Sequence, residues 1–434
     1  MTRTMRSVLL FALVALAFVC VGVFQSWTLA MTILNMSLIS AVLALGVNIQ
    51  WGYAGLFNVG IMGFTAIGGL AVVLVSMPPV PEAWAAGGLR ALAGLVLGAA
   101  TVVAAIIVWR RMAAGKVRVL ALIATVIVGY FITRAVFAPA REAISAVNPS
   151  TTGYLGGANL PVLFSWPVGA LFAAGLAWVI GKISLGLRSD YLAIATLGIS
   201  EIVIATLKFE NWATRGVSNV AGLPRAVPRP VDLQGLPWVQ TLADDLGFNV
   251  VELASLLEKL GYALLFTIVL ALLITLSELA LKSPWGRMMR AIRDNETAAR
   301  AMGKDVKARH LMIFVLGSGV CGLAGAMMVT LDGQLTPGSY DPLRFTFLMW
   351  VMVIVGGSGN NWGAVLGGFV IWFLWVEAEP MGRIVMNVLT SGMAEDNAVR
   401  LHLLDQAAHM RLLLMGAALL FMLRFAPRGL IPER

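Results

Sequence analysis

Charge is scarce in this sequence. Only 12% of its 434 residues are Asp, Glu, Lys or Arg, whereas 59% are hydrophobic. Soluble globular proteins carry about 25% charged and about 45–50% apolar residues, so this chain has too little polar surface to coat a water-soluble globule. The composition predicts a polytopic integral membrane protein and argues against soluble enzymes, nucleic-acid binders and disordered scaffolds. The net charge of +9 fits this class, because Lys and Arg collect in the cytoplasmic loops of membrane proteins.

Cysteine and histidine are also rare. Both cysteines, Cys20 and Cys321, lie inside apolar runs, so free buried thiols are expected rather than a disulfide framework. The three histidines are far apart, and no cysteine joins the closest pair, His402 and His409. The sequence also has no nucleophile constellation and no pair of intramembrane carboxylates. We therefore expect no metal site and no catalytic site in this chain.

What the sequence does contain is a series of long apolar stretches. A bilayer core of about 30 Å requires about 20 apolar residues per helix. The stretch 346–378 is too long for one ordinary helix and is interrupted by GGSGNNWG, which predicts two shorter elements. The fold class expected is an all-α membrane protein with about 10–12 transmembrane helices, some of them short and broken by glycine. The candidate spans are 7–25, 29–50, 53–76, 89–109, 118–138, 166–185, 191–208, 261–281, 311–330, 346–378 and 405–425.

The basic loops predict the orientation of these spans. The short loop 110–118, the loop 282–310 and the C-terminal tail RFAPRGLIPER are all rich in Lys and Arg. Because positive residues favour the cytoplasmic side, we expect these segments and both termini to be cytoplasmic. The segment 209–260 then forms an extracytoplasmic loop. Long ordered loops are often functional, although a passive cap is the alternative.

Two segments are unusually rich in glycine for membrane helices. They are WGYAGLFNVGIMGFTAIGGL at 51–70 and VGGSGNNWGAVLGG at 355–368. Paired glycine-interrupted segments in the two halves of a transporter often line its translocation path, whereas any single glycine more often serves close helix packing. The candidate path-lining residues in these segments are Tyr53, Asn58, Thr65, Gly356, Gly357 and Gly359.

A carboxylate stands in the middle of another apolar stretch. Glu201 lies within the candidate span 191–208. An ionised carboxylate at that depth is costly and usually faces a cavity or a partner. We therefore include Glu201 among the candidate path residues, with a carboxyl group buried and hydrogen-bonded between two helices as the alternative.

The loop 282–310 has the pattern of an amphipathic helix between two membrane spans. Ser283 is a good N-cap, Pro284 suits the first helical position, and Gly303 fits a C-terminal cap. The helix is expected to break near Asn295. Its apolar and arginine-rich faces permit three interpretations, namely a helix on the anionic lipid surface, a solvated connector, or a helix that docks on a cytoplasmic subunit.

Several stretches, in order along the chain, resemble one family. They are NIQWGYAGLFNVGIMGF at 48–64, RSDYLAIATLGISEIV at 188–203, SPWGRMMRAIRDNETAARAMGKDVKARHLMIFVLGSGVCGLAGAM at 283–327, VIVGGSGNNWGAVLGG at 353–368 and FAPRGLIP at 425–432. Together they are similar to the LivM-type permeases of branched-chain amino acid ABC importers. The resemblance implies an ABC importer permease fold, with residues 1–434 as a single transmembrane permease domain in the bacterial cytoplasmic (inner) membrane.

The same resemblance implies the partners. They are a homologous LivH-like permease, two cytoplasmic ATPase subunits of the LivG and LivF type, and an extracytoplasmic substrate-binding protein. ATP and magnesium would bind the ATPase subunits and not this chain, which has no Gly-x-x-x-x-Gly-Lys-Ser/Thr phosphate loop. The chain would then be a transport subunit, not an enzyme. Coupling to the ATPases is implied for Gly286, Arg287, Arg290, Arg293, Asp294, Glu296, Ala299 and Gly303.

The chain departs from the family pattern at 85–162, where two extra apolar segments suggest an insertion. The expected function is ATP-driven import of branched-chain or other hydrophobic amino acids by alternating access. A permease for urea or short amides is the closest alternative. An ion-coupled secondary transporter is less favoured, because such proteins usually bury several ionisable residues and these spans hold few.

Overall fold

The structure, a computed structural model, describes residues 3–148, 152–394 and 397–433. Nine helices in these ranges are long and apolar enough to cross a membrane. This confirms the all-α polytopic class. Seven of these spans centre on α1 (Arg3–Phe24), α2 (Trp27–Ala54), α7 (Ser165–Ser184), α8 (Ser189–Phe209), α12 (Val250–Lys282), α15 (Val306–Asp332) and α17 (Asn361–Leu389), and the other two on α5 (Leu89–Arg111) and α6 (Lys116–Ala146).

The remaining elements are short. Two are apolar helices, α3 (Ile61–Ser76) and α16 (Pro342–Gly356). Near the C-terminus α18 (Ala398–Asp405), η5 (Gln406–His409) and α19 (Met410–Phe425) follow one another, with a bend of 61° between α18 and α19. The others are α4 (Pro81–Ala83), η1 (Trp84–Gly88), η2 (Val162–Phe164), α9 (Asn211–Thr214), η3 (Gly216–Ser218), β1 (Val220–Ala221), α10 (Pro230–Gln234), α11 (Pro237–Leu246), α13 (Pro284–Asp294), α14 (Glu296–Ala301), β2 (Gln334–Leu335) and η4 (Pro337–Ser339).

The helices α2 and α15 form the centre of the bundle. Small residues let neighbouring backbones approach, as is usual between membrane helices. A Cβ atom on Gly68 would lie 1.8 Å from the carbonyl oxygen of Gly322, and one on Gly325 would lie 1.9 Å from that of Thr65. The glycines of α3 and α15 therefore allow close packing where these helices cross. Close packing was the alternative to a role in lining the translocation path.

The first glycine-rich segment is divided differently from the prediction. The expected boundary between two spans lay near residues 51–52, but α2 continues to Ala54 and ends where Gly55 takes a left-handed φ of 66°. Residues 55–60 are not helical, and α3 begins at Ile61. Gly55 can adopt this φ at no steric cost, and its N–H is bonded to the carbonyl groups of Gln50 and Trp51. Tyr53 consequently belongs to α2.

The second glycine-rich segment breaks as predicted. The helix α16 ends at Gly356 and α17 begins at Asn361. Between them Gly357 and Gly359 have positive φ values of 120° and 81°, and the Asn360 side chain caps α17. The second element is longer than expected, since α17 has 29 residues.

The predicted extracytoplasmic loop 209–260 is partly helical. The helix α12 begins at Val250, 11 residues before the predicted span, because the Asn249 side chain caps its first turn. From there the helix continues without a break through the apolar run to Lys282. Antiparallel pairing of β1 with β2 brings Val220 opposite Leu335 and ties this segment to the chain after α15. The guanidinium of Arg225 also pairs with the Glu258 carboxylate of α12.

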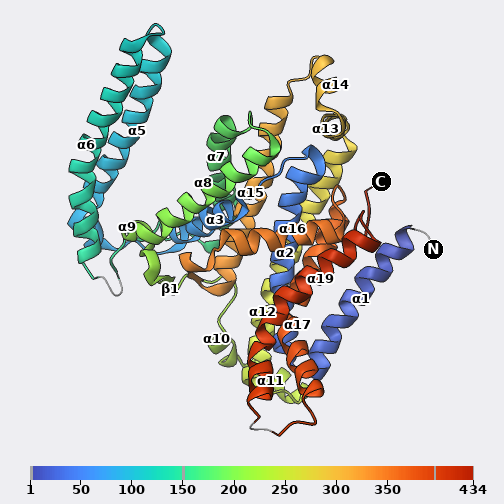
Figure 1. Ribbon diagram of the computed structural model, residues 1–434. Helices are drawn as coiled ribbons and strands as arrows, with labels where there is room; N and C mark the ends of the chain where they lie inside the picture. Colours follow the sequence, from blue (N-terminus) through green and yellow to red (C-terminus); the bar gives the residue numbers. More distant parts are fainter. Residues whose placement is uncertain (1–2, 149–151, 395–396, 434) are drawn as a thin grey trace.

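The helices α5 and α6 form a long hairpin that stands apart from the other helices (Figure 1). Little of either helix is buried. The hairpin is joined to the remainder at its base, where Arg141 pairs with Glu210 at 3.4 Å and Phe137 makes an edge-to-face contact with Trp212. Its long apolar exposed surface suits contact with lipid chains.

Candidate functional site

The segment between α12 and α15 (residues 283–305, hereafter the α13–α14 loop) lies within the predicted loop 282–310 and forms two short helices. The Ser283 hydroxyl accepts the N–H of Gly286, and Pro284 occupies the first turn of α13. Asn295 ends α13 and caps α14, where its Oδ1 accepts the N–H of Ala298 at 2.9 Å. Gly303 follows with a left-handed φ of 76°. The predicted caps and the break near Asn295 are confirmed.

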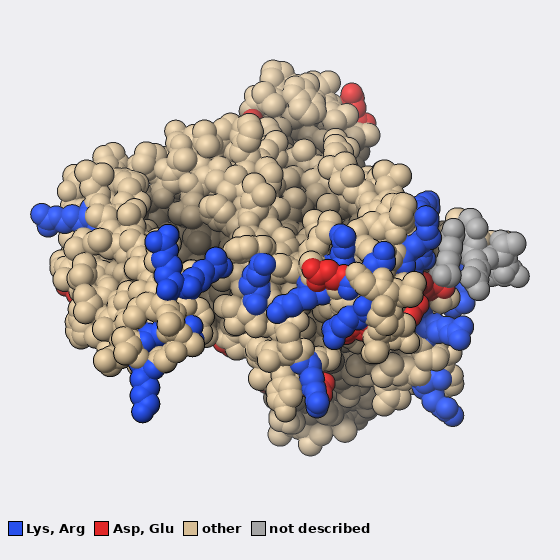
Figure 2. Space-filling model, turned by 90° about the horizontal axis from the view of Figure 1, so that it is seen from above, with Lys and Arg blue, Asp and Glu red and all other residues tan. Residues whose placement is uncertain are grey.

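One face of this loop packs on the bundle. Gly286, Met289, Ile292 and Ala299 are buried. Gly286 allows the chain to turn sharply from α12 into α13, since a Cβ atom there would lie 2.4 Å from the carbonyl oxygen of Leu281. The opposite face is exposed and charged, and it belongs to an end of the molecule where Lys and Arg side chains gather (Figure 2). We call this end the basic end.

Arg293 connects α13 to two distant parts of the chain. Its guanidinium donates to the carbonyl oxygen of Gly52 in the last turn of α2 and pairs with the Glu433 carboxylate at 2.9 Å. It also contacts Asp294 at 3.2 Å. Burial alone would lower the pKa of Arg293, but hydrogen bonds and charge from Glu433 and Asp294 outweigh burial and raise that pKa. The guanidinium therefore stays charged while it is partly buried.

The other candidate coupling residues make only local bonds. Arg287 donates to the Lys282 carbonyl at 3.1 Å and Arg290 to the Leu281 carbonyl at 3.4 Å. Glu296 pairs with Arg300 one turn along α14, and both are exposed. The side chains of Arg287, Asp294 and Glu296 thus remain accessible on the outer face, where a second protein could contact them.

Beside Arg293, the two glycine-rich segments meet. A Cβ atom on Gly52 would lie 2.6 Å from the Gly359 nitrogen. That nitrogen donates to Asn48 Oδ1 at 2.8 Å. Asn361 accepts from Asn48 at 3.2 Å and from the Tyr53 hydroxyl. We call this contact between residues 48–55 and 356–361 the glycine junction.

The C-terminal tail closes the glycine junction from outside. The N–H of Leu430 donates to the carbonyl of Val355, and the N–H of Ile431 donates to that of Gly356, both at 2.9 Å. Glu433 then reaches Arg293. The α13–α14 loop, both broken segments and the tail are therefore linked at one place.

Two candidate path residues, Asn58 and Thr65, follow the glycine junction along the chain. Asn58 is buried, donates to Gln50 Oε1 at 2.8 Å and accepts the N–H of Gly60. Thr65 is buried and donates to the Ile61 carbonyl of its own helix at 3.0 Å. Their side-chain polar atoms are thus bonded inside the chain.

Glu201 lies away from the glycine junction, on α8. Its side chain is exposed, so it is not a carboxyl group buried between two helices of this chain. Ser200, its neighbour, is buried and accepts the N–H of Gly63 at 2.8 Å. The outer face of α8 therefore presents a carboxylate in the middle of a span.

Sequence reasoning missed several members of the glycine junction. Asn48 lies inside the apolar helix α2, Asn361 is the first residue of α17, and both are fully buried. Glu278 of α12 accepts from Asn361 at 3.1 Å. Buried polar side chains must find partners, so the Asn48 amide within an apolar run was a usable signal. Nothing local distinguished Glu433, which gains its role only when the chain is folded.

The fold and this site define a polytopic helical membrane protein whose basic end carries a two-helix loop bonded to two glycine-broken segments. A sequence model of the family described as "Branched-chain amino acid transport system / permease component" matches residues 120–423, and the chain belongs to this family.

The curated relatives include LivM proteins. The chain is 24% identical to the "High-affinity branched-chain amino acid transport system permease protein LivM" of Escherichia coli, over 61% of this chain and 56% of that protein. It is 25% identical to a probable LivM of Methanocaldococcus jannaschii, over 61% of this chain and 67% of that protein. A probable LivH of the same archaeon is 31% identical over 24% of this chain and 32% of its own length. The match thus spans little more than half of the E. coli relative, and no solved structure matches the chain.

Proposed function

We propose that this chain is the transmembrane permease subunit of an ATP-driven ABC importer that moves branched-chain or other hydrophobic amino acids inward. Membership of the permease family and similarity to LivM proteins support this proposal. The proposed partners are a LivH-like permease, LivG- and LivF-like ATPases that bind ATP and magnesium, and an extracytoplasmic binding protein. Similarity to a LivH protein favours a permease pair.

The proposed location is the bacterial inner membrane, with the basic end and both termini in the cytoplasm. The gathering of Lys and Arg at this end supports the orientation. The ATPase subunits would then meet the exposed face of the α13–α14 loop. The segment 209–260 would face outward toward the binding protein, and residues 85–162 would be an insertion that extends the permease domain in the bilayer.

The observation that carries the mechanism is the bridge made by Arg293. When the ATPase dimer closes, it would displace α13. Arg293 would pass this displacement to the Gly52 carbonyl and to Glu433. Because Gly52 lies against Gly359, movement at this point would alter how the two broken segments fit together. That rearrangement would open the substrate path on alternate sides, with ATP hydrolysis on the partner chains.

Glu201 has a different part in this proposal. A carboxylate exposed in the middle of a span is costly in lipid and usually faces a protein partner or a water-filled path. The outer face of α8 would therefore lie toward the second permease and the path between the two chains. Permeases for urea or short amides remain the nearest alternative, since selectivity would depend mostly on the external binding protein.

Co-purification from native membranes tests the proposal. Two ATPase chains should accompany the wild type and a Gly392→Asp control, whose exposed glycine has open space around it. Gly286→Asp should lose them, because a side chain there displaces α13 from α12. A wild-type protein that purifies alone and transports leucine without ATP would contradict the proposal and favour a secondary transporter.

A further inference from the structure

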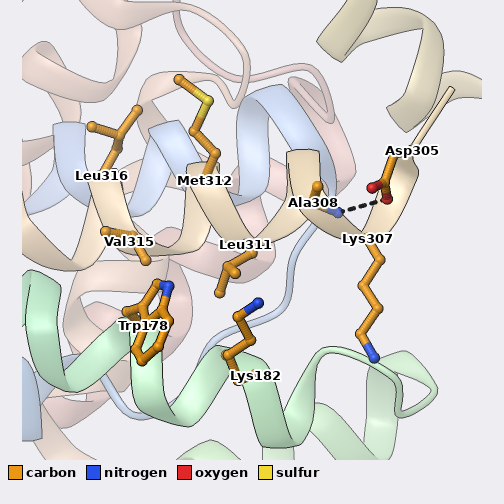
Figure 3. A pocket seen from close by; sticks show the side chains of 10 residues that line it. Trp178, Lys182, Asp305, Lys307, Ala308, Leu311, Met312, Val315 and Leu316 are labelled. Atoms are coloured by element: carbon orange, nitrogen blue, oxygen red, sulfur yellow. Dashed lines mark hydrogen bonds between the residues drawn. The ribbon is translucent and has the colours of Figure 1, made fainter.

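A groove lies between α7 and α15 where both helices reach the basic end. Its volume is about 410 Å³, and Trp178 and Lys182 line it from α7, opposite Leu311 and Val315 of α15 (Figure 3). Met312 and Leu316 of α15 also line this space, with side chains that point away from α7 (Figure 3). Both are exposed, although they belong to an apolar span. The groove therefore offers an apolar surface that opens to the outside of the bundle.

Two positive charges stand at one end of this groove. Lys182 lies in the last turn of α7 and Lys307 in the first turn of α15, and both side chains are exposed. In Figure 3 Lys307 extends toward the chain that follows α7, and its Nζ lies 3.8 Å from where a Cβ atom on Gly186 would be. The Lys182 ammonium lies 5.6 Å from the centre of the Trp178 ring. An acidic lining residue, Asp305, accepts the N–H of Ala308 at 3.0 Å as the cap of α15.

We propose that this groove binds an anionic phospholipid of the cytoplasmic leaflet, with its phosphate at Lys182 and Lys307 and an acyl chain along Val315 and Leu316. The order of the lining matches such a lipid, since the charges are confined to the basic end and the apolar residues continue toward the middle of the span. Basic pockets between membrane helices on the cytoplasmic side commonly bind anionic headgroups. Trp178 also fits, because tryptophan favours the boundary between headgroups and acyl chains.

The site has a consequence for the α13–α14 loop. Lys307 lies four residues after Gly303, directly after that loop. A lipid phosphate held between Lys182 and Lys307 would link the start of α15 to the end of α7. The inference rests on the proposed function only for its orientation, and its test measures lipid binding rather than transport.

Native mass spectrometry of the delipidated full-length protein tests this proposal. Phosphatidylglycerol and phosphatidylcholine with the same acyl chains are titrated separately. The wild type should bind phosphatidylglycerol more tightly, by about fivefold for each lysine. The Lys182→Gln/Lys307→Gln variant should lose this preference. The matched control, Arg110→Gln/Lys116→Gln, removes two exposed charges from the tip of the α5–α6 hairpin, which also lies at the basic end. This control should keep the preference for phosphatidylglycerol.

A second variant tests the apolar part of the groove. Leu316→Trp leaves both lysines in place but fills the groove from an exposed position, so it should weaken binding of phosphatidylglycerol at least as strongly. Equal phosphatidylglycerol binding by the wild type and both groove variants would overturn the proposal, as would an equal loss in the control. A second protein chain that occupies the groove in place of lipid, and that Leu316→Trp releases, would also overturn it.

Discussion

At the scale of single residues, Arg293 joins α13 to segments that are far away in the sequence. Its partners are a backbone carbonyl in α2 and a carboxylate in the C-terminal tail. Hydrogen bonds to charged groups contribute about 1.5–3 kcal/mol each, which exceeds the value of a typical exposed ion pair. The neighbouring glycines, Gly52 and Gly359, have no side chains, so the two broken segments and the Arg293 guanidinium can pack closely against one another.

The closest approach in the glycine junction gives the first prediction. Gly52→Ala should lower the thermal stability of the purified protein, because the added Cβ would lie 2.3 Å from Asn48 Oδ1 and 2.6 Å from the Gly359 nitrogen. Overpacking of this kind costs about 1–3 kcal/mol. Gly198→Ala is the control, since nothing lies within 4 Å of its added Cβ. A thermal-shift assay in which both variants unfold at the same temperature would refute the close contact.

At the scale of elements, α13 depends on its first residues. It has 11 residues, too few to be stable as an isolated helix in water, so its cap and its buried face must hold it in place. The Ser283 hydroxyl accepts the Gly286 N–H and donates to the Ala280 carbonyl at 2.7 Å. The serine thus joins the end of α12 to the start of α13.

Removal of this cap gives the second prediction. Ser283→Ala should increase the amide exchange of residues 284–294 by about fivefold, which corresponds to about 1 kcal/mol for a lost N-cap. Ser255→Ala is the control, because that hydroxyl donates to the Val251 carbonyl within α12 at 2.9 Å and does not cap the helix. Hydrogen-exchange mass spectrometry measures both variants. Unchanged exchange over α13 in Ser283→Ala would show that packing alone holds the helix.

At the scale of the whole molecule, the basic residues of distant loops gather at one end (Figure 2). The tip of the α5–α6 hairpin and the α13–α14 loop both point to this end (Figure 1). The segment with α10 and α11 lies at the other end. If the positive residues are cytoplasmic, the whole topology is determined.

Labelling with a membrane-impermeant maleimide gives the third prediction. In a Cys20→Ala/Cys321→Ala background, Val231→Cys of α10 should react in intact cells. Thr297→Cys of α14 and Lys116→Cys of α6 should react only after permeabilisation. All three side chains are exposed in the structure, so burial does not limit their reaction. Reaction of Thr297→Cys in intact cells would reverse the proposed orientation.

The sequence predicted those features that depend on neighbouring residues. Ser283, Asn295 and Gly303 act within one turn of the helix they cap, and the break at 357–360 follows from its glycines. The end of α2 was placed too early, because Gly55 and not Gly52 adopts the left-handed conformation. The bridge from Arg293 to Glu433 joins residues 140 positions apart, and no local pattern predicts such a contact.

The ratio of leucine imported to ATP hydrolysed, in proteoliposomes that contain the full complex, tests the central claim most directly. The comparison is between Arg293→Gln and Arg300→Gln, whose exposed guanidinium pairs with Glu296 of the same short helix. Arg293→Gln removes the charged contacts with the Gly52 carbonyl and Glu433, which contribute about 1.5–3 kcal/mol each. This loss should lower the ratio by about tenfold or more while ATP hydrolysis continues. Arg300→Gln should match the wild type. Equal ratios in all three proteins would contradict a coupling route through Arg293.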